Sequence, residues 1–108
     1  MNSDQLTHPV VKAAVSTMNA GNREGWLALF AADAVLTDDG SPHDYVDWSN
    51  RELFGQSRGY ITAIDRVEDS GLTLYAQFHS DRWGDFPTFL KFQVQDGKIT
   101  RLDVGQTA

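Results

Sequence analysis

The chain has 108 residues, of which 41% are hydrophobic and 11% aromatic, which is enough for one domain with a buried core but too little for two. Its formal net charge is −6 and no stretch concentrates Lys and Arg, so nucleic acid and membrane are poor candidates for partners. Because the sequence contains no cysteine, disulfide frameworks, thiolate nucleophiles and zinc–thiolate sites are excluded.

The N-terminal residues lack the charged region and apolar run of an export signal, and no segment reaches the roughly 20 apolar residues that a membrane span needs. Internal repeats and linkers are also absent from the sequence. We therefore expect residues 1–108 to form a single cytoplasmic domain.

The first predicted helix covers residues 9–18. Apolar residues recur there at i, i+3, i+4 and i+7, which is the spacing of one stripe on an amphipathic helix. Thr7 and Pro9 suit its start, and Gly21 suits a left-handed C-terminal cap.

A second helix is predicted after Asn22, which is a good N-cap residue, and it should continue through Trp26 to Phe30. Residues 34–37 then have the composition of a short strand. The turn formers of residues 38–42 should end that strand, so that two acidic residues lie at its end.

A third helix is predicted over residues 48–54, with Asp47 as its N-cap and Gly55 as its stop. The rest of the chain is strand-like. An Asp-Gly pair at residues 96–97 is the strongest hairpin signal in the sequence. The predicted strands are residues 59–67, 72–80, 86–95 and 98–104.

Alternation within these strands predicts which face is buried, because neighbouring residues of a strand point to opposite sides. The apolar face carries Leu72, Leu74, Ala76, Phe78, Phe86, Thr88, Leu90, Phe92, Val94, Leu102 and Val104. The opposite face carries Thr73, Tyr75, Gln77, His79, Phe89, Lys91 and Gln93. A sheet with one apolar face, preceded by helices whose stripes need cover, predicts an α+β fold.

Two parts of the chain resemble the nuclear transport factor 2-like superfamily, whose best-known enzymes are ketosteroid isomerases and SnoaL-like polyketide cyclases. Residues 18–22 and 26–38 are similar to the opening of that family, and residues 92–99 with 101–105 are similar to its last hairpin. The resemblance implies N-terminal helices packed on a curved, mostly antiparallel sheet that forms a cone-shaped half-barrel around an apolar pocket. It does not decide the function, because this fold carries isomerases, dehydratases, cyclases, hydrolases and adaptors without activity.

The resemblance points to Asp38 as a catalytic residue. In ketosteroid isomerase the general base is an aspartate just after the first strand, and Asp38 is the matching residue. The positions that match that enzyme's two oxyanion donors, a tyrosine and a protonated aspartate, are Ala14 and Leu90. The alternative for Asp38 is a solvated turn residue that caps the chain locally.

Aromatic residues are numerous for a domain of this size, and in this fold such residues line the cone. We expect the three nearest the opening to be Trp48, Phe54 and Phe86. The alternative is an ordinary filled core. The full set of predicted substrate-binding residues is Trp26, Phe30, Trp48, Phe54, Phe86 and Leu90.

The sequence predicts no metal site and no cofactor. Residues 38–47 are rich in oxygen ligands but lack the spacing of an EF-hand and the paired histidines of zinc hydrolases. Phosphate-binding glycine loops, dinucleotide fingerprints and nucleophile elbows are likewise absent from the sequence. His43 is expected in a loop or at the rim of the pocket, and the roles of Asp39 and Trp83 stay open.

Two functional hypotheses follow. The first is a cofactor-independent isomerase, cyclase or dehydratase that acts on a small hydrophobic carbonyl compound with Asp38 as general base. The second is a binding module without activity, which uses the same pocket or the outer face of the sheet. In either case we expect a homodimer formed through that outer face, where Tyr75 and Phe89 are mixed with polar residues.

Overall fold

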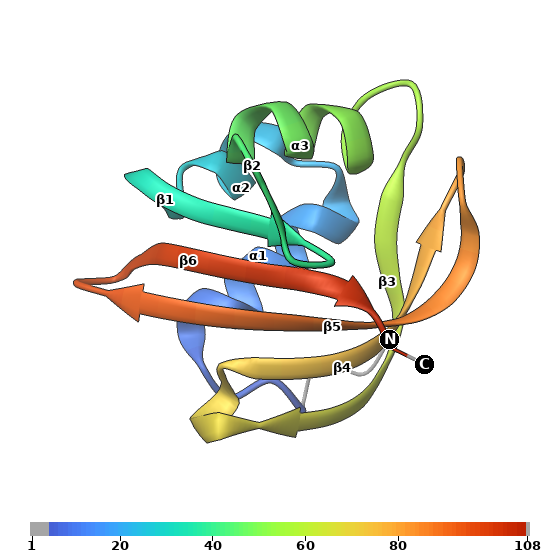
Figure 1. The fold of residues 1–108 in the computed structure, drawn as a ribbon. Helices are drawn as coiled ribbons and strands as arrows, with labels where there is room; N and C mark the ends of the chain where they lie inside the picture. Colours follow the sequence, from blue (N-terminus) through green and yellow to red (C-terminus); the bar gives the residue numbers. More distant parts are fainter. Residues whose placement is uncertain (1–4, 108) are drawn as a thin grey trace.

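The computed structural model describes residues 5–107, and Figure 1 shows their fold. Three helices belong to the first half of the chain: α1 (Pro9–Ala20), α2 (Arg23–Leu27) and α3 (Tyr45–Glu52). The strands are β1 (Phe30–Asp38), β2 (Ser41–His43), β3 (Gly59–Glu68), β4 (Thr73–Ser80), β5 (Gly84–Gln95) and β6 (Lys98–Gln106). A short 3₁₀ helix, η2 (Asp69–Gly71), joins β3 to β4.

All six strands belong to one sheet, in the order β2-β1-β6-β5-β4-β3. Neighbouring strands are antiparallel, except for the parallel pair of β1 and β6. The sheet curves around the helices without closing, as Figure 1 shows. The predicted α+β fold, with N-terminal helices on a curved and mostly antiparallel sheet, is confirmed. Within residues 5–107, none of the helices combines the length and the apolarity needed to cross a membrane.

Helix α1 begins and ends where its local chemistry dictates. His8, rather than the expected Thr7, is the N-cap, and its Nδ1 accepts a hydrogen bond from the amide of Val10 at 3.2 Å. Gly21 has φ = 71° and confirms the predicted left-handed cap. The predicted apolar stripe is also confirmed, because its residues are the buried ones: Val11, Ala14, Val15 and Met18.

Helix α2 is shorter than predicted. The side chain of Asn22 accepts a hydrogen bond from the amide of Gly25 at 2.9 Å, which confirms the N-cap. The helix nevertheless ends at Leu27, and Phe30 already belongs to β1. The cause is pairing with the distant end of the chain, since the carbonyl of Leu29 accepts a hydrogen bond from the amide of Ile99 at 2.8 Å. Strand β1 is correspondingly longer than the predicted residues 34–37.

The segment between β1 and α3 also differs from the prediction. Residues 41 and 42, expected in a turn, form β2 together with His43 and pair with the end of β1. The turn itself consists of Asp39 and Gly40, with φ of 50° and 86°. Helix α3 starts three residues earlier than predicted because its N-cap is Asp44, whose carboxylate accepts a hydrogen bond from the amide of Asp47 at 3.0 Å.

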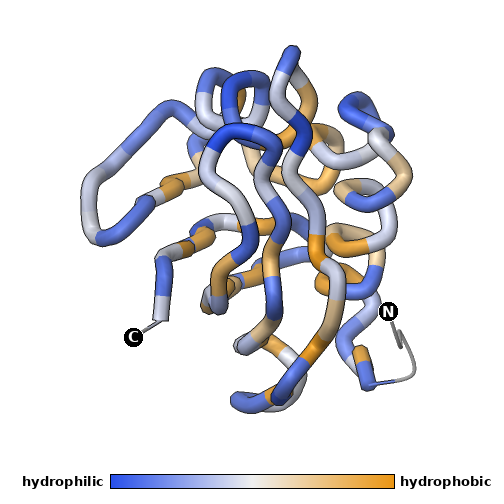
Figure 2. Tube along the Cα trace, turned by 90° about the vertical axis from the view of Figure 1, so that its right-hand side faces the viewer, coloured by the Kyte–Doolittle hydropathy of each residue, from blue (hydrophilic) through white to orange (hydrophobic). Residues whose placement is uncertain are grey.

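The core lies between the helices and the concave face of the sheet. In β4 and β5 the predicted inner face is confirmed at Leu74, Ala76, Thr88, Leu90 and Phe92, which are buried. Thr73, which was predicted on the opposite face, is buried as well, at the start of β4. In Figure 2 hydrophobic and hydrophilic stretches alternate along the tube, and the projecting turns are hydrophilic. One end of this core is unfilled, at the edge formed by α3 and by the β1–β2 and β4–β5 turns.

Candidate active site

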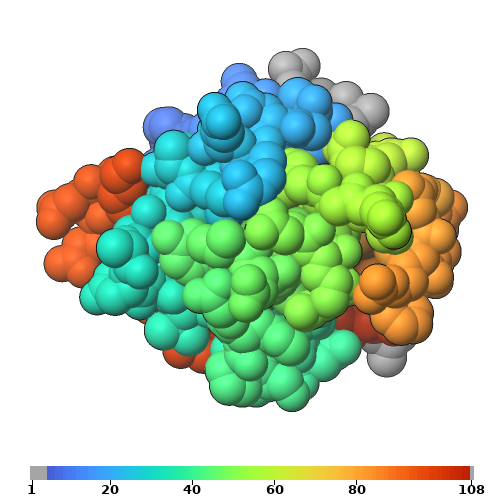
Figure 3. Space-filling view, turned by 90° about the horizontal axis from the view of Figure 1, so that it is seen from above, coloured from blue at the N-terminus to red at the C-terminus, as the bar shows by residue number. Residues whose placement is uncertain are grey.

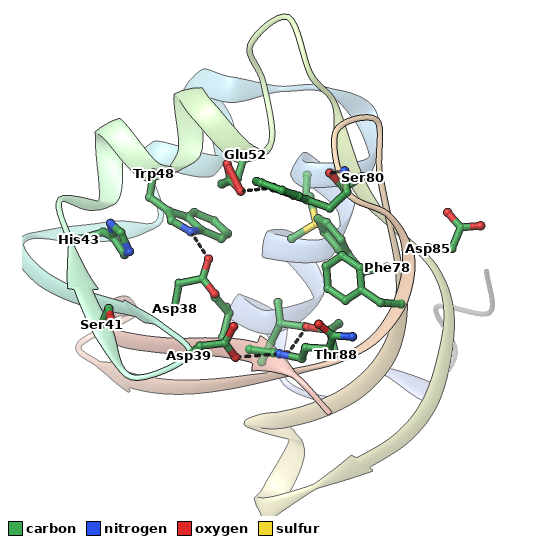
Figure 4. Close-up of a pocket in the computed structure, with 17 residues that line it drawn as sticks. Asp38, Asp39, Ser41, His43, Trp48, Glu52, Phe78, Ser80, Asp85 and Thr88 are labelled. Atoms are coloured by element: carbon green, nitrogen blue, oxygen red, sulfur yellow. Dashed lines mark hydrogen bonds between the residues drawn. The ribbon is translucent and has the colours of Figure 1, made fainter. Parts of the chain in front are cut away.

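A pocket of about 630 Å³ occupies the open end of the cone. Figure 3 looks down on this end, where a hollow separates α3, in green, from the β4–β5 turn, in orange. Figure 4 shows the side chains that line the pocket. The apolar ones are Met18, Trp48, Phe78, Trp83, Phe86, Leu90 and Val104.

Asp38 presents a carboxylate to this pocket from the end of β1. Its Oδ2 accepts a hydrogen bond from Nε1 of Trp48 on α3 at 2.9 Å. The other oxygen, Oδ1, has no hydrogen-bond donor among residues 5–107. One carboxylate oxygen is therefore held by the protein, while the second is available to a bound molecule.

The neighbouring Asp39 has a structural role. Its backbone has a positive φ of 50°, and its Oδ1 accepts a hydrogen bond from the amide of Gln106 at 3.1 Å. Its own amide donates to the carbonyl of Val104 at 2.9 Å. Asp39 thus ties the β1–β2 turn to the end of β6, and this leaves Asp38 as the acidic residue suited to chemistry at this edge.

Two hydroxyl groups lie on the opposite wall, on β4 and β5. Oγ of Ser80 accepts hydrogen bonds from the amides of Arg82 at 3.2 Å and Trp83 at 3.0 Å, so its hydrogen remains available for donation. The hydroxyl of Thr88 donates to the carbonyl of Gly105 at 2.6 Å and is committed to that contact. Ser80 is therefore a hydroxyl donor in this wall for a ligand oxygen.

Comparison with known proteins gives the fold. No family model matches the sequence, and no curated protein matches it either. The structure is similar to a protein from Sphaerobacter thermophilus (TM-score 0.76, 15% identity, 96% of this chain and 98% of that one). It is also similar to an LEH-like epoxide hydrolase of M. tuberculosis (TM-score 0.73, 17% identity, 91% and 80% covered) and to a candidate ketosteroid isomerase from Kribbella flavida (TM-score 0.66, 16% identity, 92% and 76% covered).

The chain has the nuclear transport factor 2-like fold. At these identities the likeness establishes the fold, and the role of each residue must be argued from this structure alone.

On the nuclear transport factor 2-like fold, the two positions that match the oxyanion donors of ketosteroid isomerase carry no donor here. Leu90 lines the pocket and is 3% exposed, while Ala14 is fully buried in the core. Neither side chain can form a hydrogen bond. Charge that develops on a bound carbonyl would have to be met by another group.

The predicted substrate-binding residues fall into two groups. Trp48, Phe86 and Leu90 line the pocket. The other three do not line it, which corrects the prediction for Trp26, Phe30 and Phe54. They form an aromatic cluster in and against the core, in which the Trp26 ring lies 5.2 Å from Phe30 and 6.3 Å from Phe54.

The reason is the way in which Trp26 is anchored. It is fully buried, and its Nε1 donates a hydrogen bond at 2.8 Å to Oγ of Ser49, which is fully buried too. This contact holds the cluster on one side of α3. Trp48, which precedes Ser49 on α3, donates its hydrogen bond to Asp38 in the pocket wall.

Other residues of the site were outside the predicted substrate-binding set. Phe78, Thr88 and Val104 belong to the predicted inner face of the sheet, so alternation already indicated them. Glu52 and Gln106 carried no signal in the sequence, since their place in the wall depends on pairing between distant segments. His43, which was expected in a loop or at the rim, lines the pocket from β2 and is half-buried.

His79 lies outside the pocket lining and is surrounded by acids. Its ring nitrogens contact Asp81 at 2.8 Å and Asp85 at 2.5 Å. The hydrogen bond with Asp81, followed by the one with Asp85, raises the pKa of His79 above its ordinary value. The pKa of Asp81 is lowered, first by the backbone amide of Arg58 and then by His79. Among residues 5–107, no group of three or more acidic or histidine side chains has an arrangement that could hold a metal ion.

Proposed function

We propose that this protein is a cofactor-independent enzyme that moves a proton on a small hydrophobic carbonyl compound, with Asp38 as the general base. The observation that carries the proposal is the state of the Asp38 carboxylate. One oxygen is held by the indole of Trp48 at 2.9 Å, and the other is open to a pocket that both aromatic and polar side chains line. A general base needs this combination of fixed orientation and a free lone pair.

The pocket suits a small molecule with hydrophobic rings. Its volume of about 630 Å³ lies within the range usual for small-molecule sites. Phe78 and Phe86 form one wall, with ring centroids 5.5 Å apart, and Trp48 belongs to the wall near Asp38. A flat ring system held between these walls would place a carbon atom beside the open oxygen of Asp38.

The proposed step begins when Asp38 removes a proton from the carbon next to a carbonyl group. The C–H electron pair moves into the carbonyl group, which becomes an enolate, and the proton resides on the Asp38 carboxylate. With a β,γ-unsaturated ketone the product is a dienolate, and return of the proton from Asp38 to its γ-carbon completes an isomerisation. With a second carbonyl group in reach, the enolate carbon attacks that carbonyl carbon, and the resulting alkoxide takes the proton from Asp38, which completes a cyclisation. The hydroxyl of Ser80 is the candidate donor for the enolate oxygen.

The structural neighbours support chemistry of this general kind. They include proteins named as a ketosteroid isomerase and an epoxide hydrolase, and candidate polyketide cyclases occur among the same matches. The names ketosteroid isomerase and polyketide cyclase both refer to substrates that carry carbonyl groups. The support is for the class of reaction, and the substrate itself is a matter for experiment.

A proton-exchange experiment tests the proposal without knowledge of the natural substrate. 2-Tetralone, a small aromatic ketone, is incubated with the protein in deuterated buffer, and loss of its α-proton signal is followed by NMR. We expect the protein to accelerate exchange and the variant Asp38→Asn to lose about 10²–10⁴-fold of that acceleration, because an amide cannot accept the proton.

The control is Asp39→Asn, which changes the adjacent acid and leaves the open carboxylate in place. We expect this variant to keep the acceleration. Equal loss in the two variants, or full activity in Asp38→Asn, would show that Asp38 is not the base.

A second candidate function is binding without catalysis, which is favoured by the absence of donors at Ala14 and Leu90. It predicts saturable binding of steroid-like or aromatic polyketide-like compounds, seen as a change in tryptophan fluorescence, with no exchange of α-protons. In both cases we expect the fluorescence change to vanish in Trp48→Phe, since that indole lies in the pocket wall. A change that persists in this variant would place the binding site elsewhere.

A further inference from the structure

Trp83 is an exposed tryptophan that also lines the pocket. It lies in the turn between β4 and β5, and 65% of the residue is exposed. Its Nε1 donates a hydrogen bond at 3.1 Å to Oε1 of Glu52 on α3. Figure 4 shows a dashed line at the labelled Glu52, which lies at the top of the pocket. One hydrogen bond therefore links the two walls of the mouth.

Glu52 is well placed to hold that indole. It is four residues after Trp48, so both side chains lie on the same face of α3, and both line the pocket. Its side chain is only 16% exposed, and its Oε2 lies 3.7 Å from Nη1 of Arg82 in the same turn. Arg51 contacts the same oxygen at 3.5 Å. The Glu52 carboxylate thus interacts with two consecutive residues of the β4–β5 turn.

The backbone around the turn is fixed at several points. The amide of Asp81 donates to the carbonyl of Arg58 at 2.9 Å, and the Arg58 amide donates to the Asp81 carboxylate at 3.0 Å. Oγ of the buried Ser80 accepts the amides of Arg82 and Trp83. The side chain of Trp83 is held by Glu52 and by Arg82, whose guanidinium carbon lies 5.6 Å from the centroid of the ring, so its rotation requires these side-chain contacts to break but no movement of the backbone.

We propose that the Trp83 indole is a gate on the pocket and that its hydrogen bond to Glu52 is the latch. When the bond is made, the indole spans the mouth between the β4–β5 turn and α3. When the bond breaks, rotation of the side chain opens the mouth while the pocket walls keep their positions. This inference rests on the proposed function in one respect, since it requires that the pocket binds a small molecule.

A gate has a kinetic signature that a simple contact lacks. If the indole must swing away for a molecule to enter or to leave, weakening the latch raises the association and dissociation rate constants together. The dissociation constant of the ligand then changes little, because the variant lacks the bond in its free and in its bound state alike. Loss of an ordinary contact with the ligand would instead raise the dissociation rate alone.

The probe for this experiment is N-phenyl-1-naphthylamine, an uncharged dye whose fluorescence rises in apolar surroundings. Stopped-flow mixing gives both rate constants for the wild-type protein, for Trp83→Phe, which keeps a ring but has no N–H, and for Glu52→Leu, which removes the acceptor. We expect both rate constants to rise about two- to tenfold in each variant, as the loss of one solvent-exposed hydrogen bond implies. The control is Arg51→Gln, which removes a contact to Oε2 of Glu52 and leaves Oε1, the acceptor of the indole N–H, in place; both rates should stay unchanged.

The latch is also visible in the free protein. The chain has three tryptophans, and each indole N–H has its own acceptor: Ser49 for Trp26, Asp38 for Trp48 and Glu52 for Trp83. In an NMR spectrum of the indole N–H groups, Glu52→Leu should move the Trp83 signal and increase its exchange with water. The Trp26 signal should stay in place and serve as the internal reference.

Several results would overturn the gate. They are a Trp83 signal that Glu52→Leu leaves unchanged, a rise in the dissociation rate alone, and a failure of the dye to bind any of the proteins. The proposed chemistry fails separately. Dye kinetics as described, together with no acceleration of proton exchange, would support the gate and refute Asp38 as a general base.

Discussion

The hydrogen bond between Trp26 and Ser49 should be worth several times more than its exposed counterparts, because both partners are fully buried. In Ser49→Ala the indole N–H of Trp26 loses its acceptor in a place that water does not reach. An unsatisfied buried donor costs about 1–3 kcal/mol, so we expect the free energy of unfolding to fall by about 2 kcal/mol. For a domain of this size that corresponds to a fall of about 10 °C in the melting temperature.

Urea denaturation followed by circular dichroism measures this change. The midpoint should fall while the slope of the transition stays constant, since the surface exposed on unfolding is nearly unaltered. The control is Ser16→Ala, an exposed position on α1, where alanine should be neutral or slightly stabilising. A loss below about 0.5 kcal/mol in Ser49→Ala would refute the argument that this bond anchors α3.

Two further predictions concern the outer surface. The pKa of His79 is raised in the folded protein, so its contribution to stability is fully present below the unfolded value of 6.5 and is lost as the pH rises through the folded value. His79→Gln should therefore reduce the difference between the free energies of unfolding at about pH 6 and at about pH 8. An unaltered difference would contradict the role of Asp81 and Asp85. We also expect a homodimer through the outer sheet face, where Tyr75 and Phe89 are directly paired across β4 and β5. Light scattering should give twice the mass of one chain, and Phe89→Glu should reduce that mass to a single chain. A dimer that survives this change would lie on another face.

Local chemistry in the sequence was sufficient for much of the fold. The inner face of β4 and β5 followed from alternation, since a period of two holds regardless of what lies further along the chain. The cap at Gly21 and the hairpin at residues 96–97 followed from backbone conformations that few residues adopt easily. These features depend on neighbours in sequence, and the structure has them where they were predicted.

The features that differed depend on distant contacts. Helix α2 ends early because Leu29 bonds to Ile99, which is 70 residues away in sequence. Asp44 and Asp47 are both good N-cap residues, and the choice between them was made by the pairing of β2 with β1. No local pattern contains that information.

The same distinction applies to the site. Asp38 could be located because it follows a strand and matches a family pattern, and the structure places it in the pocket wall. Its partner Trp48 was predicted in the pocket, but the hydrogen bond between them depends on the rotation of α3, which the buried contact of Ser49 helps to set. The contact between Trp83 and Glu52 joins a turn to a helix and had no counterpart in the sequence.

A structure of the protein with 2-naphthol tests the central claim most directly, because this compound is a flat analogue of the enol of 2-tetralone. We predict that it lies between Trp48 and Phe86, with its C1 atom about 3–3.5 Å from Oδ1 of Asp38 and its hydroxyl group towards Ser80. Binding with the Asp38 carboxylate turned away from the ring, or binding outside this pocket, would contradict the account.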